Sequence, residues 1–303
     1  MHKIRFGPDG IHIFDRDTGT NLLLDEVQVE QDRWTKSPRQ VSIALTNACE
    51  LECTHCYAPK EPARLKLETL KGWILELDVA GCFGVGFGGG EPLLYPSFFE
   101  LCEFVQQKTK MAVTLTTHGH RLNKTAVKRL KHSVNFMRVS MDGAEKTYEG
   151  IRGVPFSKLL DKLALLKGEM LFGINCVVNS STINDLSLVA EIAEKYKAQE
   201  LLLLPEVEYG RGRMIANSTL SQMIDWVANY KGSLQLAVSS SHAGLVGAEL
   251  PLSKESDLIG FAHIDAQGVM KSCSFERKGV PIENDGVMRA FEKLIGDGYE
   301  NLE

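Results

Sequence analysis

Residues 41–56 read VSIALTNACELECTHC, an apolar run that leads directly into three cysteines with the spacing CxxxCxxC. The run over residues 41–45 has the length and the β-branched content of a buried strand. Cys49, Cys53 and Cys56 offer three thiolate ligands, one fewer than the four that close a structural metal site. The stretch therefore predicts a strand whose following loop holds a metal centre with one open coordination position.

Strand-like and helix-like segments alternate along the chain around this stretch. Strict alternation implies right-handed crossovers and a parallel sheet, and we expect an α/β fold, a partial (β/α)6 barrel of the TIM type. Ligands bind at the carboxyl ends of the strands in such a barrel, which is where the cysteines fall. The expected strands are 41–45, 83–87, 112–116, 136–140, 172–178 and 200–204, and the expected helices are 67–79, 97–108, 124–131, 157–167, 185–196 and 218–230.

The two ends of the chain have a different pattern. The first residues contain short strand-like pieces separated by turn sequences, which predict a small N-terminal β-hairpin element. The last part is irregular at first, and then gives a hairpin candidate at 263–270 and a helix candidate at 286–295. We therefore predict three domains, namely a β element over 1–39, a barrel over 40–231 and a C-terminal extension over 232–303.

The composition excludes several classes of function. The chain has 303 residues with a net charge of -5 and interspersed charges, which gives no sign of a nucleic-acid-binding or membrane-surface face. No apolar run approaches the roughly 20 residues that span a bilayer, and the start lacks the apolar segment of a signal peptide. We expect a cytoplasmic protein whose partners include neither nucleic acid nor membrane. The seven cysteines are an odd number, which favours reduced thiols over a disulfide scaffold.

Several motifs in sequence order resemble the radical S-adenosylmethionine (SAM) superfamily, over about residues 40–213. Its signature is CxxxCxxC with an aromatic residue or histidine before the last cysteine, and His55 has that position. Residues 87–92, FGGGEP, resemble the family's GGEP element, and residues 139–143, VSMDG, resemble its SxDG element. Further matches are Arg152-Gly153 to the RG element, 177–179 to VxN, and Pro205 with 210–213 to PxxxGR; His118 departs from the usual TNG.

This resemblance implies a cofactor and roles for single residues. The three cysteines would bind three irons of one 4Fe-4S cluster, and SAM would chelate the fourth iron. Gly89, Gly90 and Glu91 would hold the methionine amino group, Ser140 would contact the ribose and Arg152 the carboxylate, with Asp142 also in the SAM site. An electron from a flavodoxin- or ferredoxin-type donor would cleave SAM reductively, and the resulting 5'-deoxyadenosyl radical would abstract hydrogen from a substrate.

Each motif also has a plainer interpretation. The cysteines alone could belong to a zinc site that a remote histidine completes, and the glycines could form a tight turn. Ser140 and Asp142 could cap the next helix, and Arg152 could be a solvated side chain. His118 is more simply a surface histidine. Three other cysteines lie in apolar segments and are most simply small core residues, namely Cys82, Cys102 and Cys176. The order and combination of the motifs favour the SAM interpretation.

Within the superfamily, the motifs resemble a branch of peptide- and cofactor-modifying enzymes that carry a SPASM or Twitch extension with auxiliary clusters. Residues 264–275, IDAQGVMKSCSF, resemble the hairpin of that extension, but Cys273 is its single cysteine. One thiol does not hold a cluster by itself. We therefore expect one cluster per chain and a degenerate extension without an auxiliary cluster.

Three functions follow as hypotheses. The first is a radical SAM enzyme that matures a ribosomally made peptide or protein, with the N-terminal β element available for strand addition. The second is the same chemistry on a small metabolite such as a sugar, nucleotide or amino acid, which the missing auxiliary cysteines favour. The third is a non-enzymatic iron-sulfur or zinc protein. No acid-base pair is identified, because Glu206 and Glu208 after the last barrel strand are more simply solvated loop charges.

Overall fold

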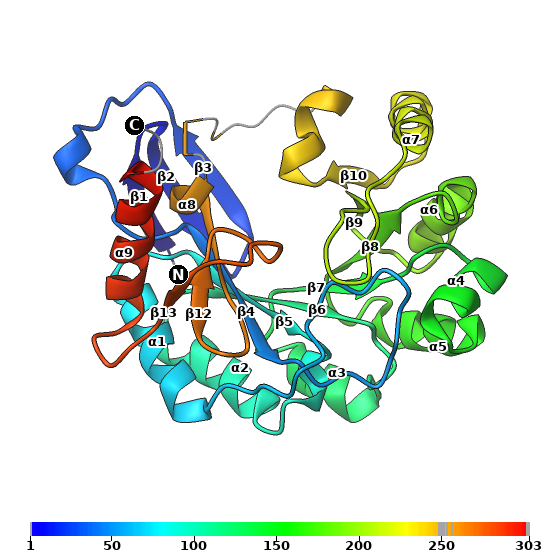
Figure 1. The fold of residues 1–303 in the computed structure, drawn as a ribbon, viewed down its shortest axis with the longest axis horizontal. Coiled ribbons are helices and arrows are strands. Elements are labelled where there is room, and N and C mark those ends of the chain that lie inside the picture. The colour runs from blue at the N-terminus through cyan, green and yellow to red at the C-terminus, as the bar shows by residue number, and fades with distance from the viewer. Residues whose placement is uncertain (1, 248–251, 253, 256, 301–303) are drawn as a thin grey trace.

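The computed structural model describes residues 2–247, 252, 254–255 and 257–300, so the outer limits of the two predicted flanking domains lie outside the described residues. Its centre is a ten-stranded sheet with the order β10-β9-β8-β7-β6-β5-β4-β11-β12-β13. The strands from β10 to β11 in that order pair in parallel. The sheet curves, with the helices α1 to α7 along its outer side, and it does not close into a barrel among the described residues (Figure 1).

All six predicted strand-helix units are present, and their bounds agree with the prediction to within about two residues. The strands are β4 (Gln40–Thr46), β5 (Gly84–Gly89), β6 (Ala112–Thr117), β7 (Phe136–Ser140), β8 (Phe172–Val178) and β9 (Glu200–Pro205). The helices are α1 (Leu67–Val79), α2 (Phe98–Lys108), α3 (Lys124–Leu130), α5 (Phe156–Leu166), α6 (Leu186–Lys195) and α7 (Asn217–Asn229).

Alternation along β4 explains how the barrel is packed. Val41, Ile43 and Leu45 are fully buried in the main hydrophobic core, which the helices share. Side chains alternate between the two faces of a strand, so Ser42 and Ala44 lie on the opposite, inner face. Cys82, Cys102 and Cys176 are also fully buried in this core, as predicted. Apolar residues therefore face the helices, and small or polar residues line the barrel interior.

The unpredicted features include one strand, one helix, and the pairing of the first hairpin strand with the barrel. Strand β10 (Gln235–Val238) pairs with β9, and strand β11 (Phe261–Ile264) pairs with β4, so the parallel sheet gains one strand at each end. Helix α4 (Glu145–Arg152) has only eight residues and buries Tyr148 and Ile151. The C-terminal segment contributes to the same sheet as the barrel, while the division into three domains stays a prediction.

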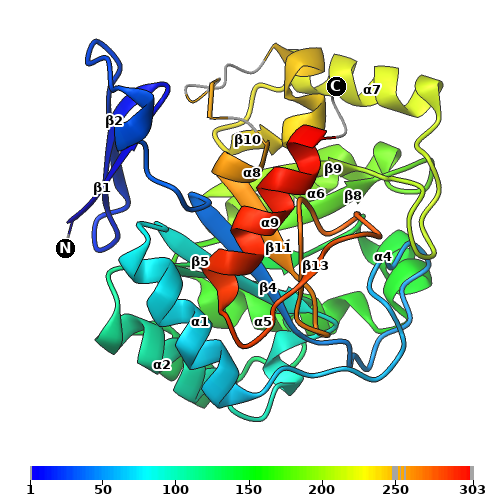
Figure 2. The ribbon, with the colours of Figure 1, turned by 60° about the vertical axis from the view of Figure 1, so that its left-hand side comes forward.

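The C-terminal segment contains the predicted hairpin and helix. Strands β11 and β12 (Val269–Lys271) are antiparallel, and β13 (Val280–Pro281) pairs with β12. Helix α9 (Val287–Glu300) lies against α1, β12 and β13 (Figure 2). The remaining short helices are α8 (Asp257–Gly260), η1 (Gln31–Arg33), η2 (Pro92–Leu94), η3 (Ile183–Asp185) and η4 (Ser240–Val246). None of the described helices is long and apolar enough to cross a membrane.

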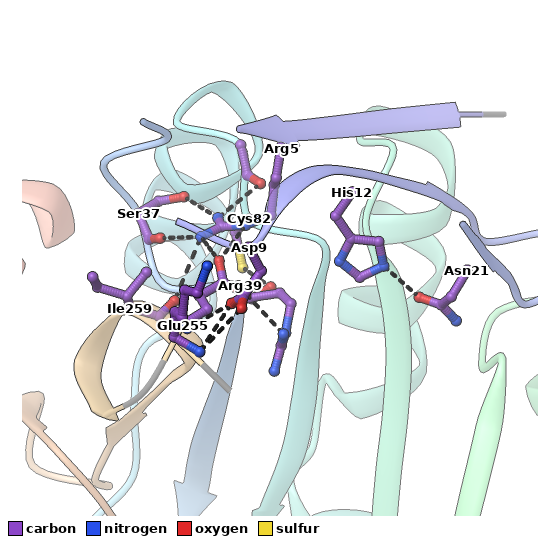
Figure 3. A network of polar contacts seen from close by, with 11 residues as sticks. Arg5, Asp9, His12, Asn21, Ser37, Arg39, Cys82, Glu255 and Ile259 are labelled. Atoms are coloured by element: carbon purple, nitrogen blue, oxygen red, sulfur yellow. Dashed lines mark hydrogen bonds and ion pairs between the residues drawn. The ribbon is translucent and has the colours of Figure 1, made fainter. Parts of the chain in front are cut away.

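The N-terminal element is a separate three-stranded antiparallel sheet of β1 (His2–Gly7), β2 (Gly10–Asp15) and β3 (Thr20–Leu24), as the turn pattern predicted (Figure 2). A buried ion-pair network attaches it to the rest of the molecule (Figure 3). Arg5 Nη2 and Arg39 Nη1 each lie 2.7 Å from a different oxygen of Glu255. Glu255 is 7% exposed, and because water cannot solvate the buried carboxylate, the two arginines stabilise its negative charge. The network connects β1, the entry to β4 and the C-terminal segment.

Candidate functional site

The loop between β4 and α1 brings the three cysteines together. Its base is closed by backbone bonds from Asn47 N to Ala63 O and from Leu65 N to Leu45 O. All three cysteines are free thiols, and they pack in one small cluster with Leu51 of the loop and Ile151 and Val154 at the end of α4. The predicted metal ligands therefore share one loop, which follows the carboxyl end of β4.

Gly89 and Gly90 place the end of β5 directly against this cysteine loop. Gly90 N donates to Thr46 O at 2.7 Å, and a Cβ atom on Gly90 would lie 2.3 Å from the carbonyl oxygen of Ala48. Gly89 has φ +123°, and a Cβ atom there would lie 2.3 Å from Thr46 O. Glycine is required at both positions because the two backbones approach so closely. The glycines therefore allow close contact between the end of β5 and the cysteine loop, and the interpretation as a tight turn alone does not explain them.

Glu91 is fully buried and joins the ends of β5 and β6. Its Oε1 accepts hydrogen bonds from Thr117 Oγ1 at 2.7 Å and from Leu93 N at 3.0 Å, and its Oε2 accepts from His118 N at 3.1 Å. The interpretation of His118 as a surface residue is wrong, because it is 4% exposed. Its Nε2 lies between Glu91 Oε2 at 3.2 Å and Glu50 Oε2 at 3.3 Å, although the angles do not make hydrogen bonds.

Asp142 and Arg152 form a buried ion pair beside the cysteine loop. Asp142 Oδ2 accepts from Arg152 Nη2 and lies 3.1 Å from His55 Nε2, while Oδ1 accepts from Val177 N at 2.8 Å. Burial opposes the charge of Asp142, but Arg152 and His55 outweigh it and hold the pKa of this carboxyl below its usual range. Arg152 Nη1 also lies 3.5 Å from Cys53 Sγ.

These contacts exclude two of the plainer interpretations. The Arg152 side chain is 10% exposed and is not solvated. The N-cap of α4 is Ala144 without a side-chain cap, so neither Ser140 nor Asp142 caps that helix. Ser140 ends β7 in register with Asn175 of β8 and is partly buried. The structure thus places all of the predicted site residues near the carboxyl ends of β4, β5 and β7, and their roles as ligands stay predictions.

The donors around the cysteine loop fit an iron-sulfur cluster with SAM. Buried Arg152 Nε and buried His55 Nδ1 have no hydrogen-bond partner, and Lys60 Nζ lies 3.6 Å from Cys56 Sγ. Burial raises the pKa of the Cys49 thiol to about 11, so a bound metal ion would have to displace its proton. A ligand carboxylate would supply an acceptor for the unsatisfied Arg152 N-H group, and cluster sulfurs would supply an acceptor for Lys60.

Beside the cysteine loop lies a pocket whose polar residues were not identified from the sequence. One wall comes from β4, β5 and the cysteine loop, and the other comes from the β11–β12 hairpin and the loop that follows it. We call it the hairpin pocket; its lining includes Asn47, Tyr57, Gly89, His263, Asp265, Lys271 and Ser274. His263 within the otherwise apolar strand FAHI was the one available signal, because a polar residue there must find a partner.

Known proteins of one superfamily resemble this chain. The radical SAM superfamily matches residues 43–196. Fe-coproporphyrin III synthase of Methanosarcina barkeri is 29% identical over 58% of this chain and 46% of its own length. Mycofactocin maturase MftC of Mycobacterium tuberculosis is 30% identical over 56% of this chain and 46% of its own length. The chain thus spans about half the length of the curated relatives it matches.

One solved structure shows the same fold over nearly the whole chain. It is Streptococcus suis SuiB bound to precursor peptide SuiA, with a TM-score of 0.74, 14% sequence identity, and coverage of 98% of this chain and 86% of that chain. The similarity includes the segments outside the six predicted strand-helix units. The open parallel sheet with its flanking elements is therefore a known arrangement.

Proposed function

The chain belongs to the radical SAM superfamily, and from this membership we propose that it is an enzyme that matures a ribosomally made peptide or protein. The superfamily's 4Fe-4S cluster and SAM, when bound, supply the 5'-deoxyadenosyl radical that abstracts hydrogen from a substrate. The observation that carries the proposal is the packing of three free thiols on one loop, beside the buried Arg152, whose Nε has no partner. We propose a flavodoxin- or ferredoxin-type protein as the electron donor.

The residues of the site would divide this work among them. We propose that Cys49, Cys53 and Cys56 hold three irons of a single cluster, while Gly89 and Gly90 keep β5 against their loop. Arg152 donates toward Cys53 through Nη1, and its unpartnered Nε is the donor available for the SAM carboxylate.

The remaining predicted SAM contacts have their own places in this proposal. Asp142 fixes the orientation of Arg152 through their ion pair. Glu91 fixes the ends of β5 and β6, and Ser140 at the end of β7 would contact the ribose. These groups bind, orient and shield the reacting centre, because the cofactors carry the redox chemistry.

The relatives support two substrate classes unequally. MftC is named a maturase, and together with the branch resemblance this favours a peptide. The second candidate is a small metabolite, which the similarity to an Fe-coproporphyrin III synthase favours, as does the single cysteine in the C-terminal segment. Membership of an enzyme superfamily argues against the third hypothesis, a non-enzymatic protein.

Anaerobic reconstitution tests the cluster assignment. We expect about four irons per chain in the wild type and a loss of the cluster in Cys53→Ser. Cys273→Ser is the matched control and should load normally, because Cys273 is a free thiol outside the cysteine loop. Zinc in place of iron would contradict the assignment, since the ligand atoms of Cys49, Glu50 and His118 lie within 4.8 Å of one another and offer zinc a site.

Product analysis tests the activity and the substrate class. With dithionite and SAM, the loaded enzyme should release 5'-deoxyadenosine, and the absence of this product despite an intact cluster would refute the enzyme proposal. Precursor peptides should raise its formation above the background if the substrate is a peptide. A response to porphyrin or nucleotide metabolites, with none to peptides, would favour the second candidate.

A further inference from the structure

The charged side of the hairpin pocket comes from a segment that the cluster and SAM do not need. Strand β11 pairs in parallel with β4, and β12 follows it as an antiparallel partner. The ring of Phe275, in the loop after β12, contacts Tyr57 of the cysteine loop with 5.2 Å between centroids and Tyr209 with 5.9 Å. These contacts hold the loop after β12 against the cysteine loop, and the hairpin residues line one pocket together with Tyr57 and Gly89.

Lys271 has hydrogen-bonding capacity that the protein leaves unused. Its Nζ lies 2.7 Å from Asp265 Oδ2, and the two side chains are 13% and 17% exposed. Asp265 Oδ1 already accepts from Gln267 N and Val269 N at 2.9 and 3.0 Å. The carboxylate thus has three donors, whereas the ammonium group has used one of its three N-H bonds. The hydrogen-bonding groups that remain free in this ion pair are therefore the N-H bonds of Lys271.

Two acids act on this ammonium group. Glu276, in the loop after β12, attracts Lys271 through space but lies outside the pocket lining, and its Oε1 accepts from Arg277 N at 2.7 Å. Among the residues that line the pocket, Asp265 is the one acid. His263 has Nδ1 2.5 Å from Ser42 Oγ, and burial lowers the pKa of its ring to about 4, so it is neutral at physiological pH. A ligand group that approaches Lys271 therefore meets a partly buried cation whose one charged neighbour in the pocket lining is Asp265.

We propose that Lys271 binds a carboxylate of the substrate in the hairpin pocket, beside the SAM site. The proposal rests on the proposed radical SAM function and names the substrate group that this enzyme would recognise. A carboxylate would accept the two remaining N-H bonds of Lys271, and such charge-assisted bonds are strong where water is partly excluded. In a peptide the group is either an acidic side chain or the chain's own C-terminus.

Two variants with opposite expected signs test the proposal. Lys271→Met keeps the aliphatic stem and removes the charge, so carboxylate affinity should fall about tenfold or more. Asp265→Asn removes the competing charge and keeps an amide oxygen for the two backbone donors, so carboxylate affinity should rise. Lys271→Arg keeps the charge and should keep the preference. Thermal unfolding of each variant checks that the fold is retained.

The probes are four N-acetylated Gly/Ala hexapeptides. Three are C-terminally amidated with a central Glu, Gln or Lys, and the fourth has a central Gln and a free C-terminus. Calorimetric titration of the cluster-loaded protein with SAM, under anaerobic conditions, gives their affinities. We expect the Glu or the free-C-terminus peptide to bind best, and the better of the two identifies the source of the carboxylate.

Several results would overturn the proposal. The first is that the Lys peptide binds most tightly. The second is that all four peptides bind equally or not measurably. The third is that Lys271→Met weakens the binding of SAM and leaves the binding of peptide unchanged. The last result would mean that Lys271 holds the SAM carboxylate instead. Wild-type release of 5'-deoxyadenosine without peptide discrimination would reject this inference alone, whereas failure to release it would reject the proposed function.

Discussion

Asp142 and Arg152 allow the sharpest test of the site's internal electrostatics. Asp142→Asn preserves the shape of the side chain and removes the charge that Arg152 and His55 face. Arg152 would then be buried without a counter-charge, and breaking one side of a buried ion pair costs about 3–5 kcal/mol. We expect that loss of unfolding free energy in urea denaturation of the anaerobic protein. Arg152→Met should cost a similar amount, because it leaves Asp142 buried and ionised.

The double variant determines whether the two charges act through each other. Removing both leaves no uncompensated charge, so the combined loss should be smaller than the sum of the two single losses by about 1–3 kcal/mol. Acid unfolding gives a second measure. The pKa of Asp142 is lower in the folded state, so its contribution is present above the unfolded-state pKa and disappears as the pH falls below about 4. Asp142→Asn should lack that part of the acid sensitivity. Additivity of the single losses within about 0.5 kcal/mol would refute this account.

Three further predictions concern other parts of the molecule. Gly90→Ala should reduce iron loading, because its Cβ would displace the cysteine loop. The control is Gly72→Ala, whose Cβ would meet nothing within 4 Å, and this variant should load iron normally. Equal iron loading of the two variants would contradict the close-approach argument. Glu255→Gln should lose about 3–5 kcal/mol of unfolding free energy, because it leaves Arg5 and Arg39 without their counter-charge. It should also make the N-terminal sheet sensitive to limited proteolysis. The control is Glu292→Gln at an exposed ion pair, which should change stability little. Burial lowers the pKa of His263 to about 4, so the unfolded state binds more protons between pH 6.5 and 4. Unfolding free energy should therefore fall by about 3 kcal/mol as the pH is lowered from 6.5 to 4, and the same loss in His263→Gln would show another cause.

Local signals were sufficient for the barrel strands and helices. Helix α1 begins and ends where its periodicity predicted, and β4 extends the predicted strand by one residue at each end. The resemblance to the GGEP element led to Gly89 and Gly90, whose close neighbours, the carbonyls of Thr46 and Ala48, are not apparent from the glycines alone. Periodicity and turn chemistry act over a few residues, so they can be read from a single chain.

Contacts between distant segments were the part that the sequence did not reveal. His118 was interpreted as a surface residue because nothing near it in sequence shows that Glu50 and Glu91 face its ring. Lys271 was passed over for the same reason. The parallel pairing of β11 with β4 depends on residues far apart in the chain, and its four-residue strand carries no periodic signal of its own.

The placement of β11 beside β4 has a consequence for the order of events during synthesis. Ser42 and His263 meet across this pair although they are 221 positions apart, so the edge of β4 next to the cysteine loop stays open until the C-terminal segment has been made. Contacts with large sequence separation form late, because the long intervening loop must first be ordered. Iron delivery can then precede closure of this edge. Pulse-labelling of amides during refolding should protect the β4–β11 pair after β4–β5, and simultaneous protection would argue against this sequence of assembly.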